Sequence, residues 1–206
     1  GVTDIVSVSA VGSLKENLPP GKFVIVDQFI DRTFARKKTF FDDEIVAHVS
    51  MAHPTSNGLM NACEEAIKKE NIEYHRGGTY VVMEGPQFST LAESNLYRSW
   101  KADVIGMTNM PEAKLAREAE ICYISMAMVT DYDCWHSGHD DVDVAEIVST
   151  LHSNAEKAKN LVVEAAMEIF TETRPLCTSS CDKALQNSII TPLDGADLSA
   201  LEAILK

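Results

Sequence analysis

The chain has 206 residues, of which 45% are hydrophobic and 24% charged, an ordinary globular composition with enough length for one substantial core. Its formal net charge of -13 argues against binding to a nucleic-acid backbone or an anionic membrane. No apolar run approaches the ~20 residues of a membrane-spanning helix. The five cysteines fit a reducing cytoplasm better than a disulfide framework, so we expect a cytoplasmic protein with free thiols.

Short runs rich in Val and Ile predict strands, several of them apolar on both faces as expected under covering helices. In chain order these runs are residues 5–10, 23–29, 79–83, 104–107 and 121–129. Apolar residues at helical spacing predict helices at 57–69, from 91 to about 100, at 111–119, and from 144 to about 170.

The boundaries of several elements carry their own signals. Thr90 and Glu93 form a capping box, and Asp143 is expected to cap the longest helix. Residues 34–43 are expected to be a loop and residues 198–205 a last short helix. Strand and helix alternate, so the fold class is α/β, with one domain over residues 1–206 that includes a variable tail from 171 to 206.

Asp131 and Asp133 directly follow the last predicted strand, at the carboxyl end where ligands bind in α/β sheets. A carboxylate accepts hydrogen bonds, whereas a protonated carboxyl group also donates them. A 6-aminopurine needs an acceptor for its amine and a donor for N7, and an acid at N7 neutralises the base as its glycosidic bond breaks. Two aspartates around a tyrosine are also common in solvated turns, and the residues alone leave both interpretations open.

The turn after residues 79–83 is a second candidate. Gly85 allows close approach of a ligand and Pro86 fixes the backbone, while Phe88 can stack on a base and Ser89 can bond a ring nitrogen. The alternative is a plain strand-to-helix turn in which Ser89 or Thr90 caps the helix.

Small, apolar and hydroxyl residues end two further strands, where they can meet a sugar and an anion. They are Ser9, Ala10, Gly106, Met107 and Thr108. Neither turn is a Walker loop or a dinucleotide fingerprint. A metal site at His136, His139, Asp140 and Asp141 is disfavoured against a solvated acidic loop, and Cys177 and Cys181 are expected to be free thiols.

Longer stretches of the sequence resemble the trimeric purine nucleoside phosphorylases. Residues 78–94 are similar to the family's signature, and residues 102–108 and 111–118 continue it. Residues 26–33, 121–128 and 130–135 resemble the branch that acts on 5'-methylthioadenosine. The similarity runs from the first strand to about Val163.

The resemblance implies a three-layer fold, a central mixed sheet flanked by helices, and a pentosyltransferase of purine and methionine salvage. The reaction would convert 5'-methylthioadenosine and phosphate to adenine and 5-methylthioribose 1-phosphate, with no cofactor and no metal. Implied base contacts are Asp131 at N7, Asp133 at the 6-amino group, Phe88 and Ser89. Implied contacts elsewhere are Met107 to ribose, Thr108, Ser9 and Ala10 to phosphate, Val144, Ile147 and Val148 to the methylthio group, and His48 to a neighbouring subunit, which implies a homotrimer.

The substrate choice rests on charge, because a carboxylate at Asp131 would repel the oxo group of a 6-oxopurine. Phosphorolysis of 6-oxopurine nucleosides remains the alternative, as does a nucleoside-binding paralogue without catalysis. Members of the family also carry an N-terminal Gly-rich turn and an Arg-His pair that bind phosphate. These have no counterpart here, and Arg32 and Arg36 lie elsewhere in the pattern. We therefore expect an N-terminally incomplete domain with little phosphorolytic activity of its own.

Overall fold

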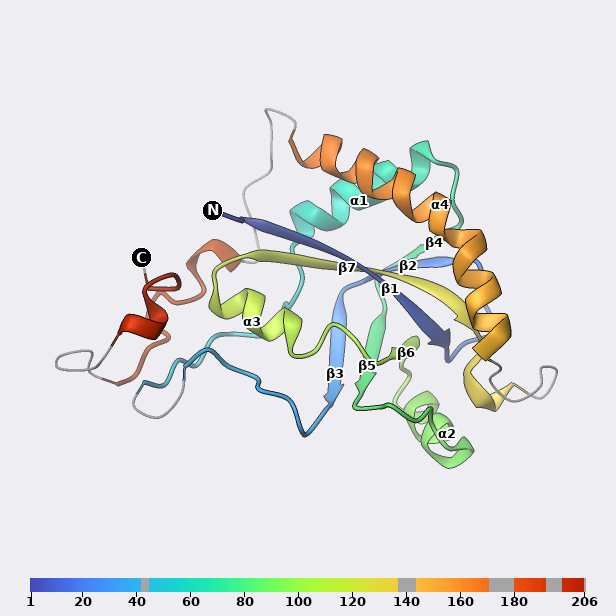
Figure 1. The fold of residues 1–206 in the computed structure, drawn as a ribbon, viewed down its shortest axis with the longest axis horizontal. Coiled ribbons are helices and arrows are strands. Elements are labelled where there is room, and N and C mark those ends of the chain that lie inside the picture. The colour runs from blue at the N-terminus through green and yellow to red at the C-terminus, as the bar shows by residue number, and fades with distance from the viewer. Residues whose placement is uncertain (42–44, 137–143, 171–179, 192–197, 206) are drawn as a thin grey trace.

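One mixed sheet of seven strands runs through the molecule, in the order β3-β5-β6-β1-β7-β2-β4 (Figure 1). The computed structural model describes residues 1–41, 45–136, 144–170, 180–191 and 198–205. The strands are β1 (Asp4–Ser13), β2 (Phe23–Val26), β3 (Gln28–Arg32), β4 (Tyr74–Arg76), β5 (Thr79–Met83), β6 (Val104–Gly106) and β7 (Cys122–Asp131). The helices are α1 (Asn57–Lys69), α2 (Leu91–Ser99), α3 (Glu112–Glu118) and α4 (Val144–Ile169), with short 3-10 turns η1 (Asp133–Trp135), η2 (Cys181–Lys183) and η3 (Ser199–Leu201).

The centre of the sheet is the long parallel pair of β1 and β7. Beyond a bulge between Val11 and Gly12, the end of β1 pairs with β6 in the antiparallel sense. Gly12 therefore has Ile105 of β6 on one side and Asp131 of β7 on the other. The carboxyl ends of β1 and β7 thus meet β6 at one place in the sheet.

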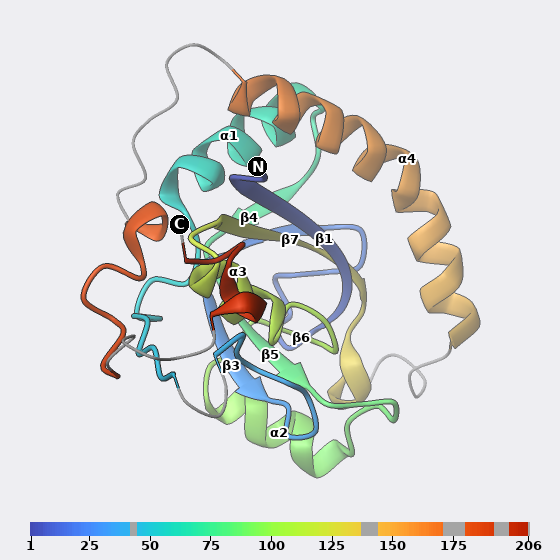
Figure 2. The same ribbon diagram turned by 60° about the vertical axis from the view of Figure 1, so that its left-hand side comes forward.

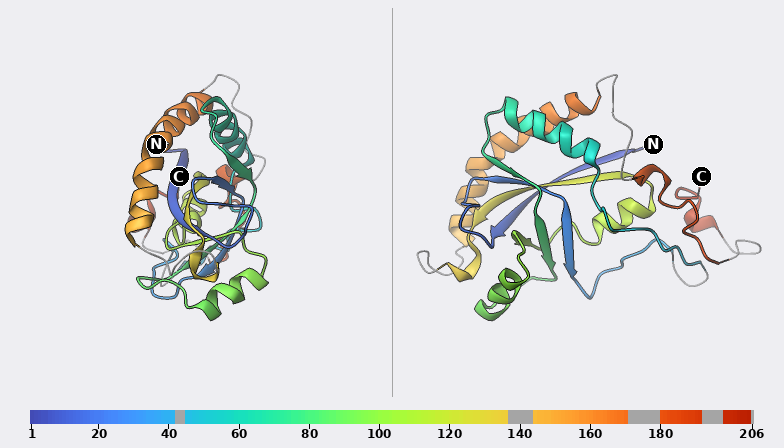
Figure 3. Two further views of the ribbon diagram at one scale, coloured as in Figure 1. Left: turned by 90° about the vertical axis from the view of Figure 1, so that its right-hand side faces the viewer. Right: turned by 180° about the vertical axis from the view of Figure 1, so that it is seen from behind.

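Helices cover both faces of this sheet, and β7 alternates between the two cores. Ile124, Met126 and Met128 face α1 and α4, which lie side by side on one face (Figure 2 and Figure 3). Tyr123, Ala127 and Val129 face the core under α3. This alternation with burial on both sides confirms the expected α/β class and explains why the strand is apolar throughout.

The predicted strand 23–29 is wrong in one respect, because it divides into β2 and β3 at widely separated positions in the sheet. The break falls at Asp27, whose Oδ1 accepts a hydrogen bond from the Gly78 N–H at 2.9 Å. The backbone N–H of Asp27 in turn donates to the Gly78 carbonyl at 3.2 Å. The apolar run hid this turn because Asp27 makes its contacts with residues distant in sequence.

Other boundaries agree with the sequence to differing degrees. The bounds of α1 and β5 are confirmed, and the Thr90–Glu93 capping box is present at the start of α2. β4 was not predicted, since its Tyr-His-Arg sequence lacks an apolar pattern. The short helix predicted at 198–205 is too long, because only the three-residue 3-10 helix η3 forms within that range. The proposed cap Asp143 lies outside the described residues.

The expectation that the cysteines stay free is wrong for two of them. Cys122, at the start of β7, forms a disulfide with Cys181, with 5.4 Å between their Cα atoms. The partners are 59 residues apart, so no local spacing announces the pair. Cys63 and Cys134 form no disulfide among the described residues, and Cys177 lies outside them. Within the described part of the chain, no helix combines the length and apolar character needed to cross a membrane.

Candidate active site

A pocket lies where the ends of β1, β6 and β7 meet the first turns of α4. It is lined by Ala10, Val11, Gly12, Met83, Phe88, Ile105, Gly106, Met107, Thr108, Thr130, Asp131, Asp133 and Ile147. Eight of the candidates named from the sequence are therefore brought together, namely Ala10, Phe88, Gly106, Met107, Thr108, Asp131, Asp133 and Ile147. They come from segments far apart in the chain, so the fold, rather than any single motif, makes the site.

The two aspartates are held by local hydrogen bonds at the end of β7. Asp131 Oδ1 accepts from the Thr130 hydroxyl at 2.8 Å, and its Oδ2 accepts from the Asp133 N–H at 3.1 Å. Asp133 opens η1 with a left-handed φ of 38°, a conformation that Asp tolerates better than most residues. A Cβ at Gly12 would lie 3.2 Å from Asp131 Oδ2, so the glycine leaves room for the carboxylate beside β1.

Burial makes both acids hold their protons more tightly. It raises the pKa of Asp131, with only the Thr130 hydroxyl opposing it. Burial also raises the pKa of Asp133. Hydrogen bonds from Ser94 and the Cys134 N–H lower this pKa, and the Asp131 and Glu93 carboxylates raise it further. Asp133 Oδ2 is buried and has no hydrogen-bond partner within the described structure. The site can therefore offer both a proton donor and an unsatisfied acceptor.

The loop between β5 and α2 supplies the aromatic wall. Phe88 lines the pocket and keeps 47% of its surface exposed, so its ring is accessible for stacking against a planar ligand. Ser89 does not line the pocket; its hydroxyl contacts Met83 Sδ at 3.8 Å and its carbonyl accepts from Cys134 Sγ at 3.4 Å. Gly85 has a φ of 72°, and a Cβ there would lie 2.5 Å from Met107 Sδ. The left-handed backbone, together with this contact, favours glycine at position 85.

A hydroxyl-rich network surrounds the other end of the pocket. Thr108 Oγ1 lies 3.3 Å from the Tyr80 hydroxyl and donates to Asn109 Oδ1 at 3.2 Å. Ser9, which is buried, donates to the same Asn109 oxygen at 3.3 Å. Asn109 Nδ2 donates to the Tyr123 hydroxyl at 2.5 Å. The sequence analysis did not identify Asn109, although it directly follows Thr108, or Tyr80, because only the fold brings Asn109 to Ser9 and Tyr80 to Thr108.

Gly106 belongs to this end of the pocket for a steric reason. A Cβ there would collide with the Tyr80 hydroxyl. Burial raises the pKa of Tyr80, so its hydroxyl stays a neutral donor and acceptor beside Thr108. Hydroxyls and amides of this kind can bind an anion or a sugar hydroxyl without carrying a full charge.

Some predicted site residues lie elsewhere. Val148 is on the next position of α4 after Ile147 and is 42% exposed, and the side chain of Val144 is outside the described part of the structure. His48 is exposed and lines a different pocket, with Arg117 and Lys183 among its other residues.

The metal site that the sequence disfavours falls mostly on residues outside the described structure. The described residues contain no group of three or more potential metal ligands. His136 Nε2 lies 3.3 Å from Glu16 Oε2, and its ring stacks on Tyr132. His139, Asp140 and Asp141 lie outside the described residues.

Comparison with known proteins gives consistent matches. Residues 1–167 match the family model described as the phosphorylase superfamily. The S-methyl-5'-thioadenosine phosphorylase of Cereibacter sphaeroides is 60% identical over 191 residues, which are 93% of this chain and 66% of that protein. The protein of the same name from Rhodospirillum rubrum is 61% identical over 194 residues, or 94% of this chain and 66% of that protein.

Solved structures agree with these matches. A methylthioadenosine phosphorylase sourced from an Antarctic soil metagenomic library superposes with a TM-score of 0.93 at 45% identity, covering 100% of this chain and 73% of that one. Methylthioadenosine phosphorylase from Schistosoma mansoni in complex with adenine gives a TM-score of 0.86 at 30% identity, covering 91% and 72%. The chain spans about two thirds of the length of the curated relatives, which is 66% for each of the first two.

Proposed function

Because the chain belongs to the phosphorylase superfamily, we propose that it acts as an S-methyl-5'-thioadenosine phosphorylase, a pentosyltransferase. In this reaction a phosphate oxygen attacks C1' of the ribose and the bond from C1' to N9 breaks. The bonding electrons pass to the purine, which takes up a proton at N7 and leaves as adenine. Phosphate is a co-substrate, and the proposal needs no organic cofactor and no metal.

The observation that carries this proposal is the buried carboxyl pair at the end of β7. Its raised pKa suits Asp131 to donate a proton to N7, where negative charge develops in the transition state. Asp133 Oδ2, which is buried without a partner among the described residues, can accept a hydrogen bond from a 6-amino group. Phe88 would cover the face of the base, and Ser89 would add a contact from the same loop.

The rest of the pocket fits the sugar and the anion. Met107 would contact the ribose, and Thr108, Ser9 and Ala10 would bind phosphate through hydroxyl and backbone groups near Asn109. Val144, Ile147 and Val148 at the start of α4 would contact the 5'-methylthio group. The second candidate, phosphorolysis of 6-oxopurine nucleosides, is disfavoured because Asp133 Oδ2, which needs a hydrogen-bond donor, would face an oxo group that cannot donate.

The same proposal includes an assembly in the cytoplasm. His48 is exposed and lines another pocket, which suits a residue that reaches into a neighbouring copy's site. We propose a homotrimer on this basis and treat residues 1–206 as one catalytic-type domain. Sedimentation equilibrium tests the assembly directly, and a monomer at all concentrations would contradict it.

Calorimetric titration of residues 1–206 with adenine and with hypoxanthine tests the base site. We expect adenine to bind more tightly, because only its amine satisfies Asp133. Adenine release from 5'-methylthioadenosine, with and without phosphate, then tests the chemistry. Preference for hypoxanthine, or no binding of either base, would contradict the proposed function.

A further inference from the structure

We infer that Arg36 is a positioning residue that holds together the two loops forming one wall of the pocket. They are the loop after β5 (residues 84–89) and the loop between β6 and α3 (residues 107–110). The sequence analysis assigned Arg36 no role, and it does not itself line the pocket. The inference rests on the proposed function only for the choice of ligand in one of its tests.

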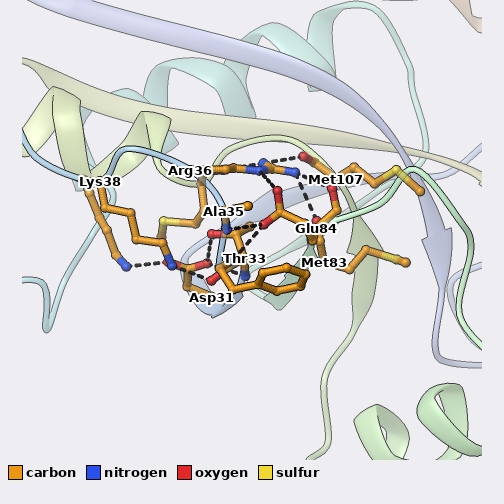
Figure 4. Close-up of polar contacts among 11 residues, drawn as sticks. Asp31, Thr33, Ala35, Arg36, Lys38, Met83, Glu84 and Met107 are labelled. Carbon is orange, nitrogen blue, oxygen red and sulfur yellow. Dashed lines mark hydrogen bonds and ion pairs between the residues drawn. The ribbon is translucent and has the colours of Figure 1, made fainter.

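All five N–H groups of the Arg36 guanidinium have acceptors on these two loops or at the last residue of β5 (Figure 4). Nη1 donates to the Met107 carbonyl at 2.8 Å and to the Met110 carbonyl at 2.6 Å. Nη2 donates to the Glu84 carbonyl at 2.8 Å and to the Met83 carbonyl at 3.3 Å. Nε donates to Glu84 Oε1 at 3.3 Å.

The acceptors belong to connections that leave neighbouring parallel strands. Met83 and Glu84 lead from β5 into the loop that carries Phe88, and Met107 and Met110 lie between β6 and α3. Met83 and Met107 themselves line the pocket. The Arg36 guanidinium, which lies outside the pocket, therefore sets the distance between the loop that carries Phe88 and Met107, the proposed ribose contact.

The segment that carries Arg36 is itself anchored. Glu84 Oε2 accepts from the Phe34 N–H at 2.7 Å and from the Ala35 N–H at 3.2 Å. On the other side, Asp31 Oδ1 accepts from the Thr33 N–H at 2.9 Å and from the Thr33 hydroxyl at 2.6 Å. Asp31 also forms ion pairs with Lys38, on the same segment, and with Lys114, on α3. The guanidinium is thus held on a braced segment rather than on a free loop.

The geometry requires arginine in particular. A planar fork can reach four carbonyls and a carboxylate at once, whereas a lysine ammonium is a compact point charge with three donors. We therefore expect Arg36→Lys to resemble Arg36→Ala. A general ion pair with Glu84 would instead be largely restored by lysine.

Amide hydrogen exchange on the full chain tests the inference without any ligand. We expect Arg36→Ala and Arg36→Lys to speed exchange in the 84–89 and 107–110 loops at least about tenfold, as expected when charge-assisted hydrogen bonds are lost. Arg76→Ala is the matched control, because it removes a guanidinium that pairs with Glu64 and Asn61 at β4 and should leave both loops unchanged. Unchanged exchange in the two loops of a folded Arg36→Ala protein would overturn the inference.

A second measurement asks whether the loops matter for binding. Adenine affinity should fall about tenfold or more in Arg36→Ala, and millimolar guanidinium should restore part of it in that variant but not in Arg76→Ala. Wild-type affinity in Arg36→Ala with faster loop exchange would overturn a role in binding. Absence of adenine binding by the wild type would count against the proposed function, while the exchange experiment would still decide the role of Arg36.

Discussion

Two pairs of carboxyl groups in this molecule have opposite electrostatic settings. Asp131 and Asp133 end β7 in the pocket, and burial raises the pKa of each. Burial acts in the same direction on Asp31, but hydrogen bonds from Lys114, Thr33 and Lys38 bring its pKa far below the usual range. The pKa of Glu84 is lowered, chiefly by the hydrogen bond from the Phe34 N–H and then by the Ala35 N–H and Arg36, while burial opposes the shift.

The difference separates acids that hold the fold from acids that are available for chemistry. Asp31 and Glu84 are surrounded by donors and brace the segment behind the pocket. Asp131 has only neutral donors from its own turn, and Asp133 keeps one oxygen without a partner among the described residues. Carboxyl groups whose pKa is raised by burial and that have no charged donor beside them are, in a pocket, candidates for general acid catalysis. The predictions below test this division.

Asp131→Asn should have the largest effect. It keeps the shape of the side chain but removes the acid, so adenine release should slow by ~10²–10⁴, typical of a lost general acid. The preference for hypoxanthine over adenine should rise, since an amide can donate to an oxo group. Adenine release by wild type and variant under the same conditions measures the first effect, and an unchanged rate would refute the N7 role.

The control for that variant is another buried acid outside the pocket. Asp103 is 7% exposed, and its carboxylate accepts from the Thr79 N–H at 2.7 Å and pairs with Lys15. Asp103→Asn should lower stability while leaving the preference between the two bases unchanged. If both variants changed the preference equally, loss of any buried carboxylate would explain the result.

Asp31→Asn should lower the free energy of unfolding by about 2 kcal/mol at neutral pH, because it breaks a partly buried pair with two lysines. The folded pKa of Asp31 is lowered, so its stabilisation is fully present above its unfolded pKa of about 4 and is lost as the pH falls toward the folded value. Urea unfolding of wild type and variant should therefore converge at acid pH. A difference that persists at low pH would contradict this account.

The exposed pair of Glu65 and Lys68 provides the matched control for Asp31. Their side chains are 57% and 49% exposed, at a separation of 2.8 Å. Glu65→Gln should change the free energy of unfolding by less than about 0.5 kcal/mol. Equal losses in the two variants would remove the distinction between a bracing acid and a surface acid.

Gly12→Ala should have a smaller effect on the pocket. The added Cβ would lie 3.2 Å from Asp131 Oδ2 and 3.4 Å from Asp133 Cβ, so the acid pair has to shift by a few tenths of an ångström. We expect adenine affinity to fall by a factor of about 3–10, equivalent to ~1 kcal/mol. Calorimetric titration measures it, and unchanged affinity would show that the pair has room to move.

Local signals in the sequence were enough for much of this picture. The bounds of α1 and β5 and the Thr90 cap follow from periodicity and capping, which depend on neighbouring residues. The convergence of Asp131, Thr108 and Phe88 was expected because strand ends gather in such folds. The family resemblance, rather than the residues alone, made the purine the preferred ligand.

What the sequence did not reveal depends on contacts between distant segments. Asp27 separates β2 from β3 through its bonds with Gly78, and Arg36 bonds to carbonyls on two other loops. The disulfide joins Cys122 to Cys181 across 59 residues. Each of these features needs the folded chain before its partner can be identified, because composition and periodicity depend on neighbouring residues.

Asp133→Asn should change the free energy of unfolding less than Asp31→Asn does, and in the opposite direction. The pKa of Asp133 is higher in the folded than in the unfolded state, so the folded state binds a proton more tightly at this group. The stability of the protein therefore falls as the pH rises above the pKa that Asp133 has in the unfolded chain. Asn tolerates the left-handed backbone at this position and carries no buried charge. The variant should therefore gain about 0.5–1 kcal/mol at neutral pH and nothing at acid pH, measured by urea unfolding. A loss of stability at neutral pH would show that Asp133 belongs with Asp31 among the bracing acids.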